Sequence, residues 1–274
     1  MPLLDNPIAA IAFIAAALIL LSLIAYWGAQ LMRRRLDDAA RRKLLAEGKA
    51  QRFVWLPDGI AHASYYRAQG TGSANTPVVV LIHGFSTPSF VWRDHIEPLT
   101  QAGFRVLTYD HFGRGFSARP RREYDAALLD RQLDTLLDAF DLKEPVHLVG
   151  YSMGGAVAMN LAASPDAPKI DGLILAAPAV WGWHSMNLLY RSALWTAAHV
   201  APDQRLTGQG LGIMPSDNIE MLRDLGRDPL VIKETRIATV YGLVGLMDGA
   251  YEAAPKISVP VLYLYGAKDQ LVPR

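Results

Sequence analysis

The hexapeptide GYSMGG at residues 150–155 constrains the fold of this chain more than any other stretch. A short apolar run, residues 146–149, precedes it, and a helix-forming run, residues 156–163, follows it. A serine held between a strand and a helix with almost no loop must adopt a strained backbone, and the flanking Gly150 and Gly154 permit the two elements to approach closely. The pattern predicts that Ser152 presents its hydroxyl at the carboxyl end of a strand, in front of a helix N-terminus.

Strand-like apolar runs alternate with helical patterns on both sides of this turn. Further strands are predicted at residues 78–82, 104–109, 172–176 and 261–265, and helices at about 89–102 and 124–140. Two strands at 52–56 and 60–68 bracket the turn signal Pro57-Asp58-Gly59 and indicate an opening hairpin. Continuous apolar runs indicate strands that are covered on both faces. We therefore expect an α/β fold with a mostly parallel sheet and helices on both of its faces.

The alternation stops between residues 179 and 255, which are rich in Trp, Leu, Met and Tyr. We expect a helical cap inserted over the strand ends, where ligands bind in such sheets. The predicted core then comes in two parts, residues 51–178 and 256–274, the second of which looks incomplete. Four cap residues are predicted to line a substrate pocket, with packing of the cap onto the core as the alternative: Trp181, Trp183, Met186 and Tyr190.

The N-terminal end carries an uncharged apolar run from Ile8 to Ala29. About 22 residues at ~1.5 Å each make roughly 33 Å, enough to cross the hydrocarbon core of a bilayer. Basic residues follow the run rather than precede it, which argues against a cleavable signal peptide and predicts a cytoplasmic C-terminal side. We expect residues 1–35 to be a single-pass anchor in the cell inner membrane and residues 36–50 to be a basic helical stalk. A buried soluble helix is the alternative.

Composition excludes several kinds of site. The chain has no cysteine, so it has no disulfide, no thiolate nucleophile and no cysteine-ligated metal. Its 274 residues fit one large domain with accessories, and its net charge of +1 gives no sign of a nucleic-acid-binding surface.

The stretches 78–176 and 261–273 resemble the α/β-hydrolase superfamily. The cap is similar to that of bacterial lysophospholipase and monoacylglycerol lipase-like serine hydrolases in three segments, APAVWG at 177–182, SDNIEM at 216–221 and RDPLVIK at 227–233. The loop YDHFGRGFS at 109–117 is more similar to small-molecule esterases and C–C bond hydrolases. The resemblance implies a serine hydrolase that cleaves carboxylic esters of single-chain lipids, such as lysophospholipid or monoacylglycerol, or alternatively small esters or C–C bonds. The anchor predicted from the apolar run would tether this hydrolase to the membrane.

The resemblance also assigns roles to particular residues. Ser152 would be the nucleophile, and the N–H groups of Met153 and of Phe85 would form the oxyanion hole. Phe85 follows His83-Gly84, and we expect His83 to order this loop rather than to act as a base. Asp269, in the segment GAKDQLVP at 266–273, would hold the imidazole of the base in one tautomer. Asp110 is interpreted as a structural turn residue. No metal and no cofactor are implied.

The base is missing from its usual place. Chain order in this fold is serine, acid, histidine, yet the seven histidines all precede Asp269: His62, His83, His95, His111, His147, His184 and His199. We expect the chain to be a fragment whose histidine lies beyond Arg274. Two alternatives remain, a base supplied by a histidine of the cap, His184 or His199, and a catalytically inactive binding module with the same fold. The sequence does not indicate the oligomeric state.

Overall fold

The computed structural model describes residues 15, 17–27, 51–69, 76–208 and 215–272. The chain divides into two units, Met1–Lys49 and Ala50–Arg274. In the first unit, residues 17–27 form a helix. No helix within the described ranges has both the length and the apolar character needed to cross a membrane. The predicted anchor is described only at residue 15 and over residues 17–27, and the predicted stalk, residues 36–50, lies outside the described residues.

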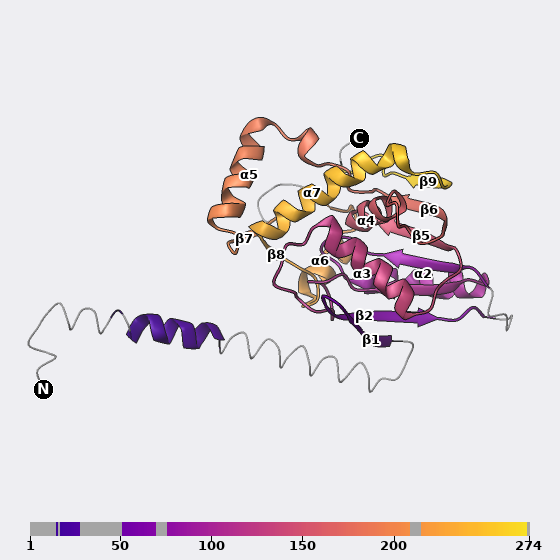
Figure 1. The fold of residues 1–274 in the computed structure, drawn as a ribbon, viewed down its shortest axis with the longest axis horizontal. Coiled ribbons are helices and arrows are strands. Elements are labelled where there is room, and N and C mark those ends of the chain that lie inside the picture. Colours follow the sequence, from indigo (N-terminus) through magenta and orange to yellow (C-terminus); the bar gives the residue numbers. More distant parts are fainter. Residues whose placement is uncertain (1–14, 16, 28–50, 70–75, 209–214, 273–274) are drawn as a thin grey trace, which may run out of the picture. The chain divides into compact units, whose positions relative to one another are not determined.

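A seven-stranded sheet with the order β1-β2-β4-β3-β5-β6-β9 forms the centre of the second unit (Figure 1). Its strands are β1 (Gln51–Leu56), β2 (Gly59–Tyr66), β3 (Val78–Ile82), β4 (Arg105–Tyr109), β5 (Val146–Tyr151), β6 (Ile170–Ala176) and β9 (Val261–Leu264). The hairpin β1–β2 joins β4 in antiparallel orientation, and all pairs from β4 to β9 are parallel. The predicted α/β architecture with a mostly parallel sheet is confirmed.

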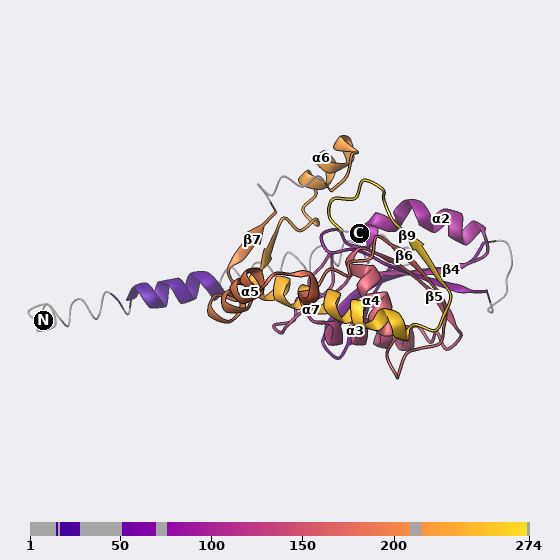
Figure 2. The same cartoon turned by 90° about the horizontal axis from the view of Figure 1, so that it is seen from above.

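Helices cover both faces of this sheet (Figure 2). The 3-10 turn η1 (Ser89–Trp92) and α2 (Arg93–Gln101) lie on one face, and α3 (Ala126–Ala139), α4 (Met153–Ala162) and α7 (Ile237–Ala253) lie on the other. Successive side chains of β3 point alternately to the two faces of the sheet. Val80 and its even-numbered neighbours pack into the cluster under α3, α4 and α7, while Val79 and Leu81 pack against Trp92. The apolar run of β3 is therefore buried on both faces, as expected.

The cap contains short strands as well as helices. Its elements are η2 (Trp183–Ser185), α5 (Leu188–Val200), β7 (Arg205–Thr207), α6 (Ile219–Arg227) and β8 (Glu234–Arg236), and a further turn, η3 (Ala254–Lys256), follows α7. β7 and β8 form an antiparallel two-stranded ribbon that the sequence did not predict. Three residues per strand are too few to produce a recognisable alternation of apolar and polar side chains.

Helix α7 packs with the core, although the sequence boundary at residue 255 placed it in the cap. Leu246 and Ala250 belong to the main hydrophobic cluster. Asn160 of α4 donates a hydrogen bond from Nδ2 to the Leu246 carbonyl at 3.0 Å, and a Cβ added at Gly249 would lie 2.8 Å from Asn160 Oδ1. Small residues at this crossing let the two helices approach closely, which the composition of the segment alone did not reveal.

Strand β9 is the edge of the sheet. All four of its residues are exposed, and in the part of the chain that the structure describes no strand pairs with its outer edge.

Candidate active site

Ser152 lies in the turn between β5 and α4 with φ 53° and ψ −118°, a conformation that non-glycine residues seldom adopt. Close packing around the turn holds it there. A Cβ added at Gly154 would lie 2.2 Å from the Ile82 carbonyl oxygen, and one added at Gly150 would lie 2.5 Å from the Gly154 carbonyl oxygen. The strained turn that the sequence predicts is present, and both glycines are required because backbone lies where their side chains would be.

The loop after β3 runs beside this turn. A Cβ at Gly84 would lie 3.4 Å from Ser152 Cβ, so the peptide that joins Gly84 to Phe85 is next to the serine. Within the described residues, neither the N–H of Phe85 nor the N–H of Met153 donates a hydrogen bond. Met153 opens α4, where backbone N–H groups have no partner inside the helix. Two unused backbone donors therefore flank Ser152, as an oxyanion hole requires.

His83 orders this loop and has no nitrogen available to act as a base. It is fully buried, its Nδ1 donates to the Gly84 carbonyl at 2.7 Å, and its Nε2 accepts the N–H of His111 at 2.9 Å. Burial lowers the pKa of His83 to about 4, so the ring is neutral at physiological pH. The hydrogen bond to the Gly84 carbonyl also fixes the direction of the Phe85 N–H, because both groups belong to the same trans peptide.

Acid is expected to destabilise this part of the fold between pH 6.5 and about pH 4. Burial lowers the pKa of His83 to about 4 and that of His111 well below its ordinary value, whereas both titrate near 6.5 in an unfolded chain. Below pH 6.5 the unfolded chain therefore binds more protons than the folded one. The free energy of unfolding should fall by about 1.4 kcal/mol per pH unit for each histidine in this window.

The Asp130→Asn variant is the suitable background for that measurement. Burial raises the pKa of Asp130 to about 8, so over this pH range the folded protein holds a proton on Asp130 that the unfolded chain releases. This carboxyl therefore makes the free energy of unfolding rise as the pH falls, which opposes the effect of the two histidines. Urea unfolding of Asp130→Asn at pH 8, 6 and 5 should give a free energy that is flat above pH 6.5 and declines below it. A constant value down to pH 5 would contradict two buried neutral histidines.

Asp110 is a structural residue, as expected. Its Oδ1 accepts the N–H of Ser89 at 2.8 Å, and its Oδ2 accepts from His62 Nδ1 at 2.8 Å and from the Phe116 N–H at 3.0 Å. Burial opposes ionisation of Asp110, but the hydrogen bond and charge of His62 outweigh it and hold the pKa well below its usual range. These bonds join the loop that follows β4 to Ser89 at the start of η1 and to His62 in β2, so Asp110 shapes the scaffold beneath the site.

Asp269 follows β9, two positions from β5 in the sheet. Its Oδ1 accepts the N–H groups of Leu271 at 2.8 Å and Val272 at 3.0 Å. Burial and, second, the negative charge of Asp269 raise the pKa of Tyr151, the residue directly before the serine. Asp269 is therefore on the same edge of the sheet as Ser152. Its Oδ2 has no hydrogen-bond partner among the described residues, which leaves that oxygen able to accept an imidazole N–H.

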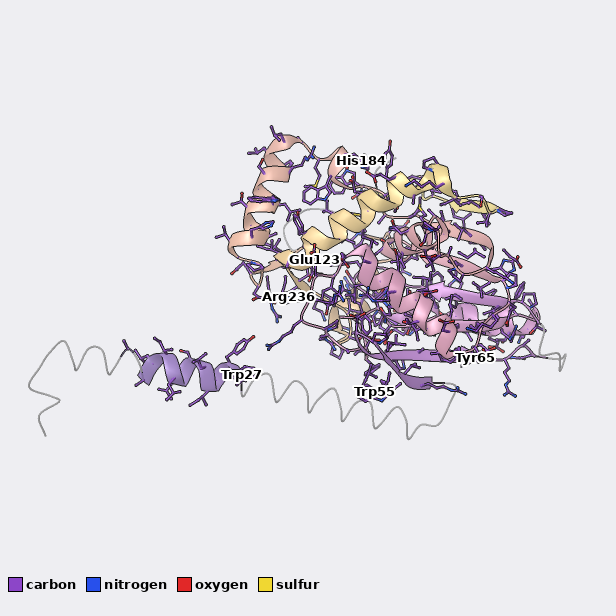
Figure 3. The ribbon with its side chains drawn as sticks, viewed as in Figure 1. Trp27, Trp55, Tyr65, Glu123, His184 and Arg236 are labelled. Carbon is purple, nitrogen blue, oxygen red and sulfur yellow. The ribbon has the colours of Figure 1, made fainter. Side chains whose placement is uncertain are left out.

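None of the seven histidines, all of which are described, hydrogen-bonds to Ser152 or Asp269. His184 pairs through Nδ1 with Asp248 Oδ1 at 2.8 Å and stacks on Tyr251, alongside α7 (Figure 3). Gly249 follows Asp248 in α7 and lies against Asn160 of α4. Asn160 is eight residues beyond Ser152, which is ~12 Å along α4, so the pair of His184 and Asp248 lies near a part of α4 that is remote from the serine.

His199 is also held within the cap, by a 2.7 Å hydrogen bond to the Trp195 carbonyl and by stacking on the Trp195 ring. The two cap histidines that the sequence left as candidate bases are therefore both engaged away from the serine.

A small cavity lies beside the proposed oxyanion donors. The volume of this cavity that the centre of a water molecule can occupy is about 10 Å³, which is room for roughly one water. Its polar lining is Arg114, Tyr124 and Thr239, and much of its apolar lining comes from Phe85, Met153 and residues of α7. The α7 residues of this lining were not predicted, because the boundary at residue 255 placed their segment in the cap.

The four predicted pocket residues do not line this cavity. Trp183 and Met186 pack on α7 against Val244 and Met247, while Trp181 and Tyr190 are exposed. Trp183 and Met186 therefore pack the cap onto α7, which was the alternative to lining a substrate pocket.

The cap is nevertheless attached at the site. The Ala179 N–H donates to the Ser152 carbonyl at 3.0 Å, and the Ile232 N–H donates to the Ser86 carbonyl at 2.9 Å. Segments from both ends of the cap thus meet the two loops that carry the candidate catalytic groups.

The family model described as serine aminopeptidase, S33 (Hydrolase_4) matches residues 73–274. The chain belongs to this family of α/β hydrolases. Phospholipase YtpA of Bacillus subtilis is 28% identical over 212 residues, which cover 74% of this chain and 80% of YtpA. An uncharacterized protein of Mycobacterium tuberculosis is 28% identical over 238 residues, but the match covers only 65% of that protein. The chain thus spans less than two thirds of the length of several curated relatives, for example 40% of one from Synechocystis.

Solved structures of lipases have the same fold. The crystal structure of a monoacylglycerol lipase from Paleococcus ferrophilus superposes with a TM-score of 0.64 at 26% identity, covering 78% of this chain and 80% of the lipase. A monoglyceride lipase from Saccharomyces cerevisiae superposes with a TM-score of 0.65 at 20% identity, covering 80% of this chain and 77% of that one, a likeness of fold alone.

Proposed function

We propose that this protein hydrolyses carboxylic esters through an acyl-enzyme formed on Ser152. The supporting observation is the strained serine at φ 53° between two backbone N–H groups that have no acceptor in the described residues. Attack of Ser152 Oγ on the ester carbonyl would form a tetrahedral oxyanion that accepts hydrogen bonds from the N–H groups of Phe85 and Met153. Loss of the alcohol leaves an acyl ester on Ser152, and water then releases the acid.

The base in this mechanism is an imidazole whose N–H would be accepted by Asp269 Oδ2. It takes the serine proton during attack and gives it to the departing alcohol. Since His83 uses both ring nitrogens and the cap histidines are held elsewhere, we do not propose any of these three for the role.

An active-site-directed fluorophosphonate tests this proposal. The full-length protein should be labelled, and Ser152→Ala should abolish the label while leaving the unfolding temperature within a few degrees, because the hydroxyl donates no hydrogen bond among the described residues that would hold the fold. Ser185→Ala, which removes a cap hydroxyl that donates to the Gly182 carbonyl, is the matched control and should keep the label. A correctly folded protein that takes no label would favour the inactive binding module.

Single-chain lipids are the substrates that we favour. One relative is named a phospholipase, YtpA, and the similar structure from Paleococcus ferrophilus is that of a monoacylglycerol lipase. In addition, α5 has no buried residue, and it exposes apolar and aromatic side chains from Leu188, at 77%, to Trp195, at 54%. Residues 172–202 contain no Asp or Glu. An apolar helix with aromatic rings and no negative charge suits contact with a lipid surface.

The membrane tether belongs to the same proposal and is supported by the uncharged run from Ile8 to Ala29. A tether would keep the catalytic unit at the surface where the lipid substrate is concentrated. Deleting residues 1–35 should therefore lower turnover of lysophospholipid in vesicles by roughly tenfold or more, and leave turnover of a soluble short-chain ester unchanged. Equal losses on the two substrates would contradict the tether.

Small esters remain the second candidate because of the cavity beside Met153. Space for about one water is too little for a long acyl chain unless side chains move. Initial rates on a series of soluble esters from acetate to decanoate decide between the two. A maximum at acetate or butyrate would favour a small-ester hydrolase, and a rise towards longer chains would favour lipids.

A further inference from the structure

Arg114 is a buried cation beside the proposed oxyanion hole. Its side chain belongs to a residue that is only 5% exposed, and no carboxylate forms an ion pair with it in the described part of the chain. Burial lowers the pKa of Arg114 to about 10, so it remains charged at physiological pH. Buried charges are usually paired, because removing an ion from water is costly. An unpaired one next to a reaction centre therefore calls for a functional explanation.

The loop between Asp110 and Ser117 directs Arg114 inward. Gly113 and Gly115, its two neighbours, adopt φ 79° and φ 45°. A Cβ at Gly113 would lie 2.6 Å from a ring carbon of Tyr124, and one at Gly115 would lie 2.1 Å from Asp110 Oδ2. The loop can wind this tightly only because both neighbours of Arg114 lack a side chain.

Arg114 holds Phe85 at two points. Its Nε donates to the Phe85 carbonyl, and the guanidinium carbon lies 4.4 Å from the centre of the Phe85 ring. On the other side, His83 holds the Gly84 carbonyl. The peptide before Phe85 is thus fixed by His83, and the peptide after it and the ring are fixed by Arg114. These contacts leave the Phe85 N–H, which lies between them, little freedom to turn away from Ser152.

We propose that Arg114 positions the Phe85 N–H for the oxyanion and that its unpaired charge stabilises the negative charge that develops there. This inference rests on the proposed function and adds a residue to its machinery. During the proposed reaction, the oxyanion would be a negative charge that forms close to Arg114, which otherwise has no carboxylate partner in the described part of the chain. Fixed charge and donors arranged in advance act strongly in a site from which water is excluded. Arg114 is a positioning residue, since it acts on the oxyanion through Phe85 and at longer range.

Arg114→Met and Arg114→Lys, in the full-length protein, test the proposal. Methionine keeps much of the apolar stem but removes the donor and the charge, and lysine keeps the charge without the planar group that stacks on Phe85. Arg119→Met is the matched control, because Arg119 donates to the Ser117 and Gly115 carbonyls of the same loop, whereas the Phe85 carbonyl accepts from Arg114. The readouts are kcat and KM on a soluble ester, the rate of fluorophosphonate labelling, and the affinity of a boronic acid that forms a tetrahedral adduct on serine.

Arg114→Met should lower kcat and the labelling rate by roughly 10- to 100-fold with KM changed less than about threefold, and boronate affinity should fall by a similar factor. Arg114→Lys should recover part of the loss, and Arg119→Met should stay within about threefold of the wild type. A loss confined to KM, or equal losses in the Arg114 and Arg119 variants, would overturn the proposal. If Arg114→Met does not fold, a folded Arg114→Lys with unchanged kcat overturns it as well.

The outcomes also separate this inference from the proposed function. Wild type that is labelled at Ser152, together with an Arg114→Met variant that is labelled equally fast, removes only the role of Arg114. Wild type that is neither labelled nor active removes both.

Discussion

Gly154→Ala is expected to destabilise the protein by more than about 3 kcal/mol and to abolish labelling at Ser152. The added methyl group would lie 2.2 Å from the Ile82 carbonyl oxygen and 2.6 Å from the His83 carbonyl oxygen. Both are backbone atoms of β3 and of the loop that follows it, so no side chain can turn aside to make room. Either α4 moves away from β3 or the turn opens, and in both cases the serine leaves its position beside Phe85.

Gly245→Ala is the matched control for this substitution. Gly245 is also in a helix that packs on the core, α7, but a Cβ there meets nothing within 4 Å. Alanine favours helix over glycine by up to about 1 kcal/mol, so Gly245→Ala should be neutral or stabilising. Urea unfolding and fluorophosphonate labelling of the two variants give the comparison. If Gly154→Ala is as stable and as reactive as Gly245→Ala, the close contact between α4 and β3 is wrong.

Asp269→Asn is expected to lower kcat on a soluble ester by roughly 10³- to 10⁴-fold with little change in stability. Asparagine keeps a side-chain oxygen that can accept the N–H groups of Leu271 and Val272, so the loop after β9 should retain its shape. The negative charge that orients the imidazole and stabilises its protonated form is lost. The separation of a large catalytic loss from a small stability loss is the expected signature.

Asp248→Asn distinguishes this role from the alternative base. Asp248 also accepts hydrogen bonds on one oxygen, from the His184 backbone N–H and from the His184 ring, but it lies on α7 away from the serine. We expect Asp248→Asn and His184→Gln to change kcat by no more than a few fold. The reverse pattern, with Asp269→Asn silent and Asp248→Asn inactive, would show that His184 and Asp248 supply the base and the acid.

The strands and helices of the core were predictable because each has a strong local signal. The run 78–82 is apolar and rich in β-branched residues, and it became β3, which is buried along its whole length. The run 146–149 became the first part of β5, in which Val146 and Leu148 are buried. The predicted helix at 124–140 became α3, which begins at Ala126 because Asp125 caps it by accepting the Leu128 N–H. Within the predicted helix at 89–102, the first turn is the 3-10 turn η1 and α2 follows it directly, a change of geometry that was not visible in the residue pattern.

The surroundings of the site were much less predictable. Thr239, Leu243 and Leu246 line the cavity, yet they are distant in sequence from Phe85 and Met153, and only the packing of α7 on α4 brings them together. Arg114 was visible as part of the loop motif, but its contact with Phe85 depends on the adjacent positions of β3 and β4 in the sheet.

The sequence alone determined the turn at Ser152, since glycines at fixed spacing between a strand and a helix leave the backbone a single way to connect them. It also identified Asp269 and the segment His83-Gly84-Phe85 as groups that follow parallel strands. Tertiary structure decided which histidines are held by hydrogen bonds, which helix lines the cavity and which cation contacts Phe85. These depend on contacts between residues far apart in the chain, and no local pattern encodes them because the partner of each side chain is set by how the helices pack on the sheet.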